Sequence, residues 1–149
     1  MTRRALLVLL LALGVPSACG RRARPLAPEL VQPMPPTGLV ARTVPDGVQL
    51  VWRRPDAYSG GARMKDLGGF DVERAAGEGG TAGEYRRVGR IELTDQTRFR
   101  QEQRIEWLDR EVTPGARYRY RVTAFTLDGY RSTAAGPVDI EAKALRDGR

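Results

Sequence analysis

Beyond residue 36, hydrophobic and polar residues alternate with a period of two. The clearest segment is 117–125, where every second residue is apolar or aromatic and most of the others are arginine. Because successive side chains of a strand point to opposite faces, such alternation is typical of a half-buried β-strand. Six further segments alternate in the same way, some of them weakly: Thr37–Val44, Gly47–Arg53, Phe70–Glu73, Tyr85–Ile91, Ile105–Asp109 and Val138–Ala142.

Glycine, proline and aspartate separate these segments, and no stretch carries a convincing helical period. Asp128-Gly129, directly after the clearest strand, is a hairpin signal. About seven short strands without helices predict an all-β fold, an antiparallel β-sandwich over residues 37–143 followed by a short tail, 144–149.

Four motifs carry a family likeness. LVW at 50–52, followed by Pro55, resembles the second strand of fibronectin type III domains, and GFDVER at 69–74 resembles their third. WLD at 107–109 and the run 112–124 resemble the fifth and sixth strands with the corner between them.

The resemblance covers about residues 35–143 and implies a seven-stranded antiparallel immunoglobulin-like sandwich. Two stretches depart from the family pattern. The loop 54–68 is longer than usual and rich in glycine, and 94–103 has no clear counterpart.

The resemblance also implies structural roles for four residues. Trp52 is expected at the centre of the core between the sheets. Tyr118 is expected to be the tyrosine of the corner, its hydroxyl bonded to the main chain near residues 112–113. Pro114 and Gly115 are residues that turn a chain, and we expect them to turn it there.

The first 18 residues read as a cleaved signal peptide. Arg3 and Arg4 precede an apolar run, Ala5–Val15, that carries no charge. As a helix this run would rise about 16 Å, against about 30 Å of bilayer hydrocarbon, so it is too short to span a membrane stably. Small residues follow it, as in secretory leaders.

Cys19 is the only cysteine, and the residues that end at it, VPSAC, resemble the lipobox of bacterial lipoproteins. Ser17 and Ala18 fit the small-residue positions, whereas Pro16 stands where the pattern usually has leucine. The resemblance implies that Cys19 is acylated, becomes the first mature residue and anchors the protein to the membrane of the cell envelope. Gly20 after it favours the outer membrane if the cell is Gram-negative. The alternative is a free thiol in a secreted protein.

Residues 19–36 predict a proline-rich linker after the lipidated cysteine. Five of the ten prolines fall between residues 25 and 36, a composition that favours an extended chain. At about 3.1 Å per residue, such a spacer would hold a domain up to roughly 50 Å from the lipid. The alternative is a proline-rich ligand for a partner. Arg21, Arg22 and Arg24 are expected to lie against anionic headgroups.

Composition removes most catalytic chemistry. The chain has no histidine, which excludes Ser-His-Asp and Cys-His arrangements and the commonest metal ligand. With Cys19 committed to lipid, thiolate and zinc chemistry are excluded too. Paired carboxylates remain possible but need a cleft to hold them, so we predict no enzyme, no catalytic residue, no metal and no cofactor.

The chain carries 25 basic and 18 acidic residues, a net charge of +7, and nearly all the basic residues are arginine. The outward arginines of segment 117–125 make a basic stripe that a polyanion could bind. In the implied fold, however, acidic residues on the neighbouring strands flank the stripe, and opposite charges on adjacent strands attract. We therefore predict a self-neutralised ladder and no nucleic-acid partner. The flanking acids are Asp71, Glu73, Asp139 and Glu141.

Two loops are the candidate partner-binding sites, Ala57–Gly68 and Leu127–Ser132, which lie at the same end of such sandwiches. Tyrosine and arginine are favoured interface anchors. The alternative is ordinary solvent-exposed loop. The candidate residues are Tyr58, Arg63, Lys65, Tyr130 and Arg131.

Together these features predict a non-enzymatic lipoprotein of the cell envelope, whose sandwich binds or positions a protein partner. The second hypothesis is a carbohydrate or cell-wall binding module, which usually needs a row of exposed aromatic side chains. Tyr58, Tyr85 and Tyr130 are the candidates for such a row.

Overall fold

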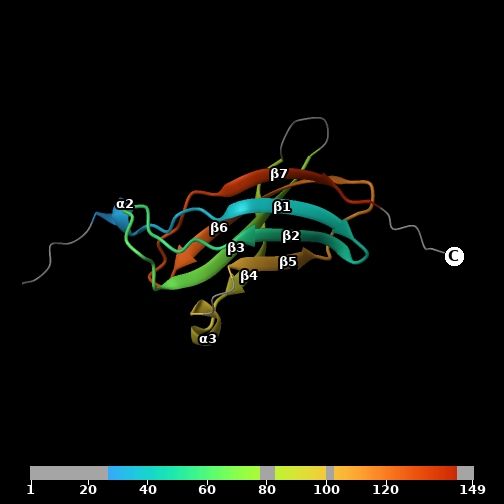
Figure 1. Cartoon of the computed structure of the whole chain (residues 1–149). Helices are drawn as coiled ribbons and strands as arrows, with labels where there is room; N and C mark the ends of the chain where they lie inside the picture. Colours follow the sequence, from blue (N-terminus) through green and yellow to red (C-terminus); the bar gives the residue numbers. More distant parts are fainter. Residues whose placement is uncertain (1–26, 78–82, 100–102, 144–149) are drawn as a thin grey trace, which may run out of the picture.

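The computed structural model describes residues 27–77, 83–99 and 103–143 (Figure 1). The predicted signal peptide, Cys19, the three arginines that follow it and the tail 144–149 lie outside the described residues.

Seven strands form two antiparallel sheets that face each other, which confirms the predicted sandwich (Figure 1). One sheet has the order β1-β2-β5 and the other β4-β3-β6-β7. β1 and β2 have the predicted bounds, and the other strands differ from prediction by a few residues at their ends. The strands are β1 (Thr37–Val44), β2 (Gly47–Arg53), β3 (Leu67–Ala76), β4 (Arg86–Glu92), β5 (Arg104–Asp109), β6 (Arg117–Thr126) and β7 (Ala135–Glu141).

The expectation of a fold without helices is wrong at two places. α2 (Pro28–Val31) and α3 (Asp95–Arg98) are single helical turns. Proline at the start of α2 fits a first turn, where its missing N–H is not needed. The hydroxyl of Thr94 caps α3 by accepting from the N–H of Thr97. A single turn is too short to leave a helical period in the sequence.

The core lies between the two sheets and is centred on Trp52. Its side chain is fully buried and meets the ring of Phe70 edge-on, with the ring centroids 5.5 Å apart. The side chains expected to face inward on β2 and β6 are all buried, because the period of two places them on the covered face. They are Val48, Leu50, Trp52, Tyr118, Tyr120, Val122 and Ala124.

The corner before β6 is closed by Tyr118. The main-chain N–H of Thr113 donates to the Tyr118 hydroxyl over 2.9 Å, the kind of bond that the resemblance implied. Pro114 and Gly115 form the turn between them, and Gly115 has a φ of 83°, which a residue without Cβ adopts freely.

Residues 27–36, the described part of the segment before β1, are not the extended spacer that we expected. Residues 27–36 include α2 and pack on the loop after β2. Pro33 is buried, and its main chain forms an isolated β-bridge with Tyr58. The N–H of Ser59 donates to the carbonyl of Gln32 over 2.8 Å, and the N–H of Met34 donates to the carbonyl of Ala57 over 3.0 Å. Proline composition favours an extended chain, but it does not indicate that this segment packs on another part of the same chain. α2 therefore sits at one end of the sandwich, opposite the C-terminal end (Figure 1).

The outer face of the four-stranded sheet carries the expected ladder of charges. β6 lies between β3 and β7, and its arginines reach acids on both neighbours. The hydrogen bond from Arg119 lowers the pKa of Asp139. The three pairs are Arg119–Asp139 at 2.6 Å, Arg121–Glu73 at 2.8 Å and Arg117–Glu141 at 3.5 Å.

Asp71 is not part of this ladder. Its carboxylate is buried and is paired with arginines that lie outside β6. It lies opposite Thr123 of β6 in the sheet. Arg131, from the loop after β6, reaches its carboxylate at 2.6 Å, and Arg87 and Arg90 of β4 lie 3.8 Å away. Burial of a charge is tolerated where it is paired, so the loop after β6 is tied to the sheet face.

Candidate functional site

The two candidate loops meet at the end of the sandwich that carries α2. The N–H of Leu127 donates to the carbonyl of Asp66 over 2.9 Å, which joins the loop after β6 to the loop after β2. Both loops lie near α2 (Figure 1). The five candidate residues nevertheless separate into different environments.

Tyr58 is occupied within the protein. Its ring is half-buried, its hydroxyl is hydrogen-bonded to Asp66, and its main chain bridges Pro33. Burial, followed by the hydrogen bond to Asp66, raises the pKa of Tyr58, so the hydroxyl stays a proton donor. Tyr58 therefore holds the N-terminal segment to the loop.

Tyr130 and Arg131 are adjacent in sequence but serve different surfaces. The side chain of Tyr130 is 39% exposed at the end of the molecule. The main chain of Arg131 forms an isolated β-bridge with Phe125, and its guanidinium reaches the buried Asp71 on the sheet face. Tyr130 thus faces solvent at this end, whereas the guanidinium of Arg131 is paired with Asp71.

Arg63 and Lys65 line a hollow of about 360 Å³ beside α3. We call this site the basic hollow. Arg54, directly after β2, and Arg98, in α3, join them there, so that four cations line one site. The hollow is lined by Arg54, Pro55, Asp56, Arg63, Met64, Lys65, Leu67, Arg98, Phe99 and Gln103.

Main-chain carbonyls fix the two inner arginines. The Nη1 and Nη2 atoms of Arg54 donate to the carbonyls of Thr97 and Arg98 over 3.2 and 2.6 Å. The Nε and Nη2 atoms of Arg98 donate to the carbonyls of Leu67 and Leu93 over 2.9 and 3.0 Å. Each guanidinium has five N–H donors in a rigid fork, so these bonds position the groups and bind α3 to the loop.

The hollow carries excess positive charge. Arg98 pairs with Asp95 at 2.7 Å, but within the described part of the chain Arg54, Arg63 and Lys65 form no ion pair. Burial, and after it the charge of Arg98, lowers the pKa of Arg54, which is the direction expected for a cation short of compensating charge.

These groups can bind an anion. Guanidinium and ammonium groups form charge-assisted hydrogen bonds with carboxylates. The ring of Phe99, 70% exposed at the same site, adds an apolar contact surface. The hollow therefore suits a chain segment that carries both acidic and apolar side chains.

Sequence reasoning found Arg63 and Lys65 but missed Arg54 and Arg98. Arg98 lies 44 positions from Arg54 and far from the candidate loops in sequence. No local motif connects these residues, and only the folded chain brings them together.

The row of exposed aromatics that a carbohydrate module needs is not formed by the residues described. Tyr58 and Tyr85 are half-buried, and the guanidinium of Arg121 covers the ring of Tyr85 at 4.0 Å. Tyr130 and Phe99 are exposed, but they belong to separate loops.

In residues 27–77, 83–99 and 103–143, no three metal-ligating side chains gather in a way that could hold a metal ion. No helix in these residues has the length and apolar character needed to cross a bilayer.

No family model matches the chain, and no curated protein matches it. Among solved structures, the kinase region of twitchin from C. elegans matches with a TM-score of 0.53 and 17% identity, over 75% of this chain and 17% of that one. The third fibronectin III domain of the human KIAA0343 protein matches with a TM-score of 0.53 and 10% identity, over 87% of this chain and 98% of that one.

The chain thus spans a small part of the twitchin structure but nearly all of a single fibronectin III domain. At these identities the likeness concerns the fold alone. The described part of the chain folds as a fibronectin type III sandwich.

Proposed function

We propose that this protein is a non-enzymatic lipoprotein of the bacterial cell envelope whose fibronectin type III sandwich binds an acidic segment of a protein partner at the basic hollow. Lipid on Cys19 holds it to the membrane, and Gly20 favours the outer membrane in a Gram-negative cell. The leader, the lipobox-like sequence and the absence of histidine support this assignment.

The observation that carries the proposal is the excess positive charge of the basic hollow. Arg54 is partly buried and is compensated by main-chain carbonyls, which are dipoles rather than opposite charges. A cation removed from water costs free energy unless an opposite charge meets it. A carboxylate bound in the hollow supplies that charge, and the exposed rim cations, Arg63 and Lys65, attract it from solution.

Neutralising the rim tests this proposal. We expect Arg63→Gln with Lys65→Gln to weaken partner binding about tenfold, because two partly screened contacts together contribute about 1.4 kcal/mol. The measurement is a crosslinking pull-down of the lipoprotein from membranes, followed by titration of the recovered partner. Binding should also weaken as salt is raised.

A matched control removes the same charge elsewhere. Arg42 and Arg86 are exposed and lie outside the hollow, so Arg42→Gln with Arg86→Gln should leave affinity unchanged. Equal affinities of the two double variants would contradict a role for the hollow. Using Gln at Arg63 and Lys65 leaves the fixed pair, Arg54 and Arg98, intact and avoids unfolding the loop.

A further inference from the structure

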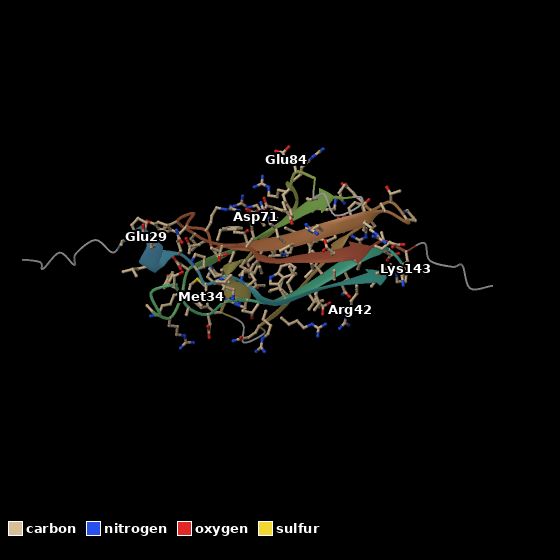
Figure 2. All side chains as sticks on the ribbon, turned by 90° about the horizontal axis from the view of Figure 1, so that it is seen from above. Glu29, Met34, Arg42, Asp71, Glu84 and Lys143 are labelled. Carbon is tan, nitrogen blue, oxygen red and sulfur yellow. The ribbon has the colours of Figure 1, made fainter. Side chains whose placement is uncertain are left out.

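The end of the sandwich that carries α2 exposes four large apolar side chains, which we call the tip surface. Leu30 and Met34 come from the N-terminal segment, and Leu127 and Tyr130 from the loop after β6. Their exposed fractions are 47%, 46%, 59% and 39%. Figure 2 shows Met34 at the end opposite Lys143. Exposed apolar side chains gathered at one place usually mark a contact surface.

Main-chain hydrogen bonds hold these side chains on a common scaffold. The carbonyl of Leu30 accepts from the N–H of Gly60 over 3.2 Å, and the carbonyl of Asp66 accepts from the N–H of Leu127 over 2.9 Å. Gly60 and Asp66 both lie in the loop after β2. This loop therefore holds the N-terminal segment on one side and the loop after β6 on the other. The tip surface is therefore one built surface and not two independent loops.

The tip surface is also where the chain arrives from the predicted anchor. Cys19 and Ala27 are eight residues apart, a distance of at most about 29 Å when fully extended. β6 alone has ten residues, about 33 Å long, and α2 lies beyond the end of the sheets (Figure 1). The domain therefore cannot stand upright on its far end on the membrane that holds Cys19, whereas it can stand on the tip surface.

The charges around the tip surface suit an anionic bilayer. Each basic residue near such a surface is attracted to it. Two acids, Glu29 and Asp128, border the tip surface and oppose this attraction. The basic residues that outnumber them are Arg21, Arg22 and Arg24, which lie in the sequence between the anchor and α2.

We propose that the tip surface docks on the interfacial layer of the membrane that holds Cys19. The proposal rests on the lipid anchor of the proposed function and goes beyond it, because it assigns a fixed orientation to the domain. Leu30, Met34 and Leu127 enter the boundary between headgroups and acyl chains, and Tyr130 suits this boundary because its ring is apolar and its hydroxyl polar.

This orientation leaves the basic hollow accessible. α3, which borders the hollow, lies to the side of the sandwich and not at the end that carries α2 (Figure 1). In a docked domain the hollow therefore faces sideways, along the plane of the membrane. Partners held in or near the same membrane are then the ones that reach it.

An environment-sensitive fluorophore tests the docking. The full chain is expressed with its own leader, labelled on one introduced cysteine, and reconstituted in vesicles of phosphatidylethanolamine and phosphatidylglycerol. Leu127→Cys places the label on the tip surface, and Lys143→Cys places it at the opposite end (Figure 2). We expect the emission to shift to shorter wavelength at 127 only. The shift should shrink when Leu30→Ser and Met34→Ser are added, and in vesicles without phosphatidylglycerol.

The other outcomes overturn the proposal in different ways. No shift at 127 while the protein floats with the vesicles refutes docking but leaves the anchor intact, and shifts at both positions indicate a domain lying on its side. A shift at 127 in native membranes but not in lipid vesicles means that a protein covers the tip surface. The chain without an introduced cysteine is the control: labelling of Cys19 and failure to float refute the anchor, and docking falls with it.

Discussion

Trp52→Ala is expected to lower the free energy of unfolding by about 3–5 kcal/mol, the range for truncating a large buried aromatic side chain. Trp52 is fully buried between the sheets and packs edge-on against Phe70. Because domains of this size are typically stable by about 5–15 kcal/mol, this one change removes a large share of the total. Urea unfolding followed by circular dichroism measures it.

Trp52→Phe is the matched control. It keeps an aromatic ring in the core and removes an Nε1–H group that has no hydrogen-bond partner among the described residues. We therefore expect a smaller loss than for alanine. If Trp52→Ala unfolds at the same urea concentration as the unaltered protein, Trp52 does not hold the sheets together.

Arg74→Met is the second large expected effect, a loss of about 3 kcal/mol. Arg74 pairs at 2.7 Å with Asp109, which is 3% exposed. Removing the cation leaves a buried carboxylate with two remaining donors, the Tyr120 hydroxyl at 2.8 Å and the N–H of Glu111 at 3.0 Å. Burial, strengthened by the bond to Asp109, raises the pKa of Tyr120, so its hydroxyl remains a donor.

The comparison for this prediction is Arg119→Met, measured by the same urea unfolding. Arg119 also pairs with an aspartate, Asp139, but this pair lies on the exposed face of the sheet. Exposed ion pairs contribute little to stability, so this variant should unfold close to the unaltered protein. Equal losses for Arg74→Met and Arg119→Met would mean that burial of Asp109 has no energetic consequence.

The strands were predictable because their physics is local. A period of two buries one side of β2 and β6, and most of the apolar residues lie on that side in both. The ladder was predictable once the strand order was implied by the resemblance. Asp71 was not, because its cation, Arg131, comes from a loop whose path depends on the whole fold.

The candidate site was only half predictable for the same reason. Arg63 and Lys65 lie in a loop that its glycine content marks as unusual. Arg54 and Arg98 are held by main-chain carbonyls from distant parts of the chain, and no spacing of residues in the sequence predicts such hydrogen bonds. The proline-rich segment misled us because proline restricts the conformation of its own residue but does not indicate what the segment packs against.

Because residues 27–36 pack on the domain, the connection between Cys19 and the domain is shorter than the spacer that the sequence predicted. An extended spacer would have carried the sandwich far from the membrane, whereas a segment that packs on the domain keeps it close. The proposed protein is thus a sandwich held at the membrane by its α2 end, with the basic hollow at its side for an acidic partner.

The measurement that tests this account most directly is mass spectrometry of the N-terminal peptide from protein purified out of membranes. Two or three acyl chains attached at Cys19, with the mature chain beginning at that residue, are the predicted result. An unmodified N-terminus at any other position would contradict the account, because neither the anchor nor the docking of the tip surface could then operate.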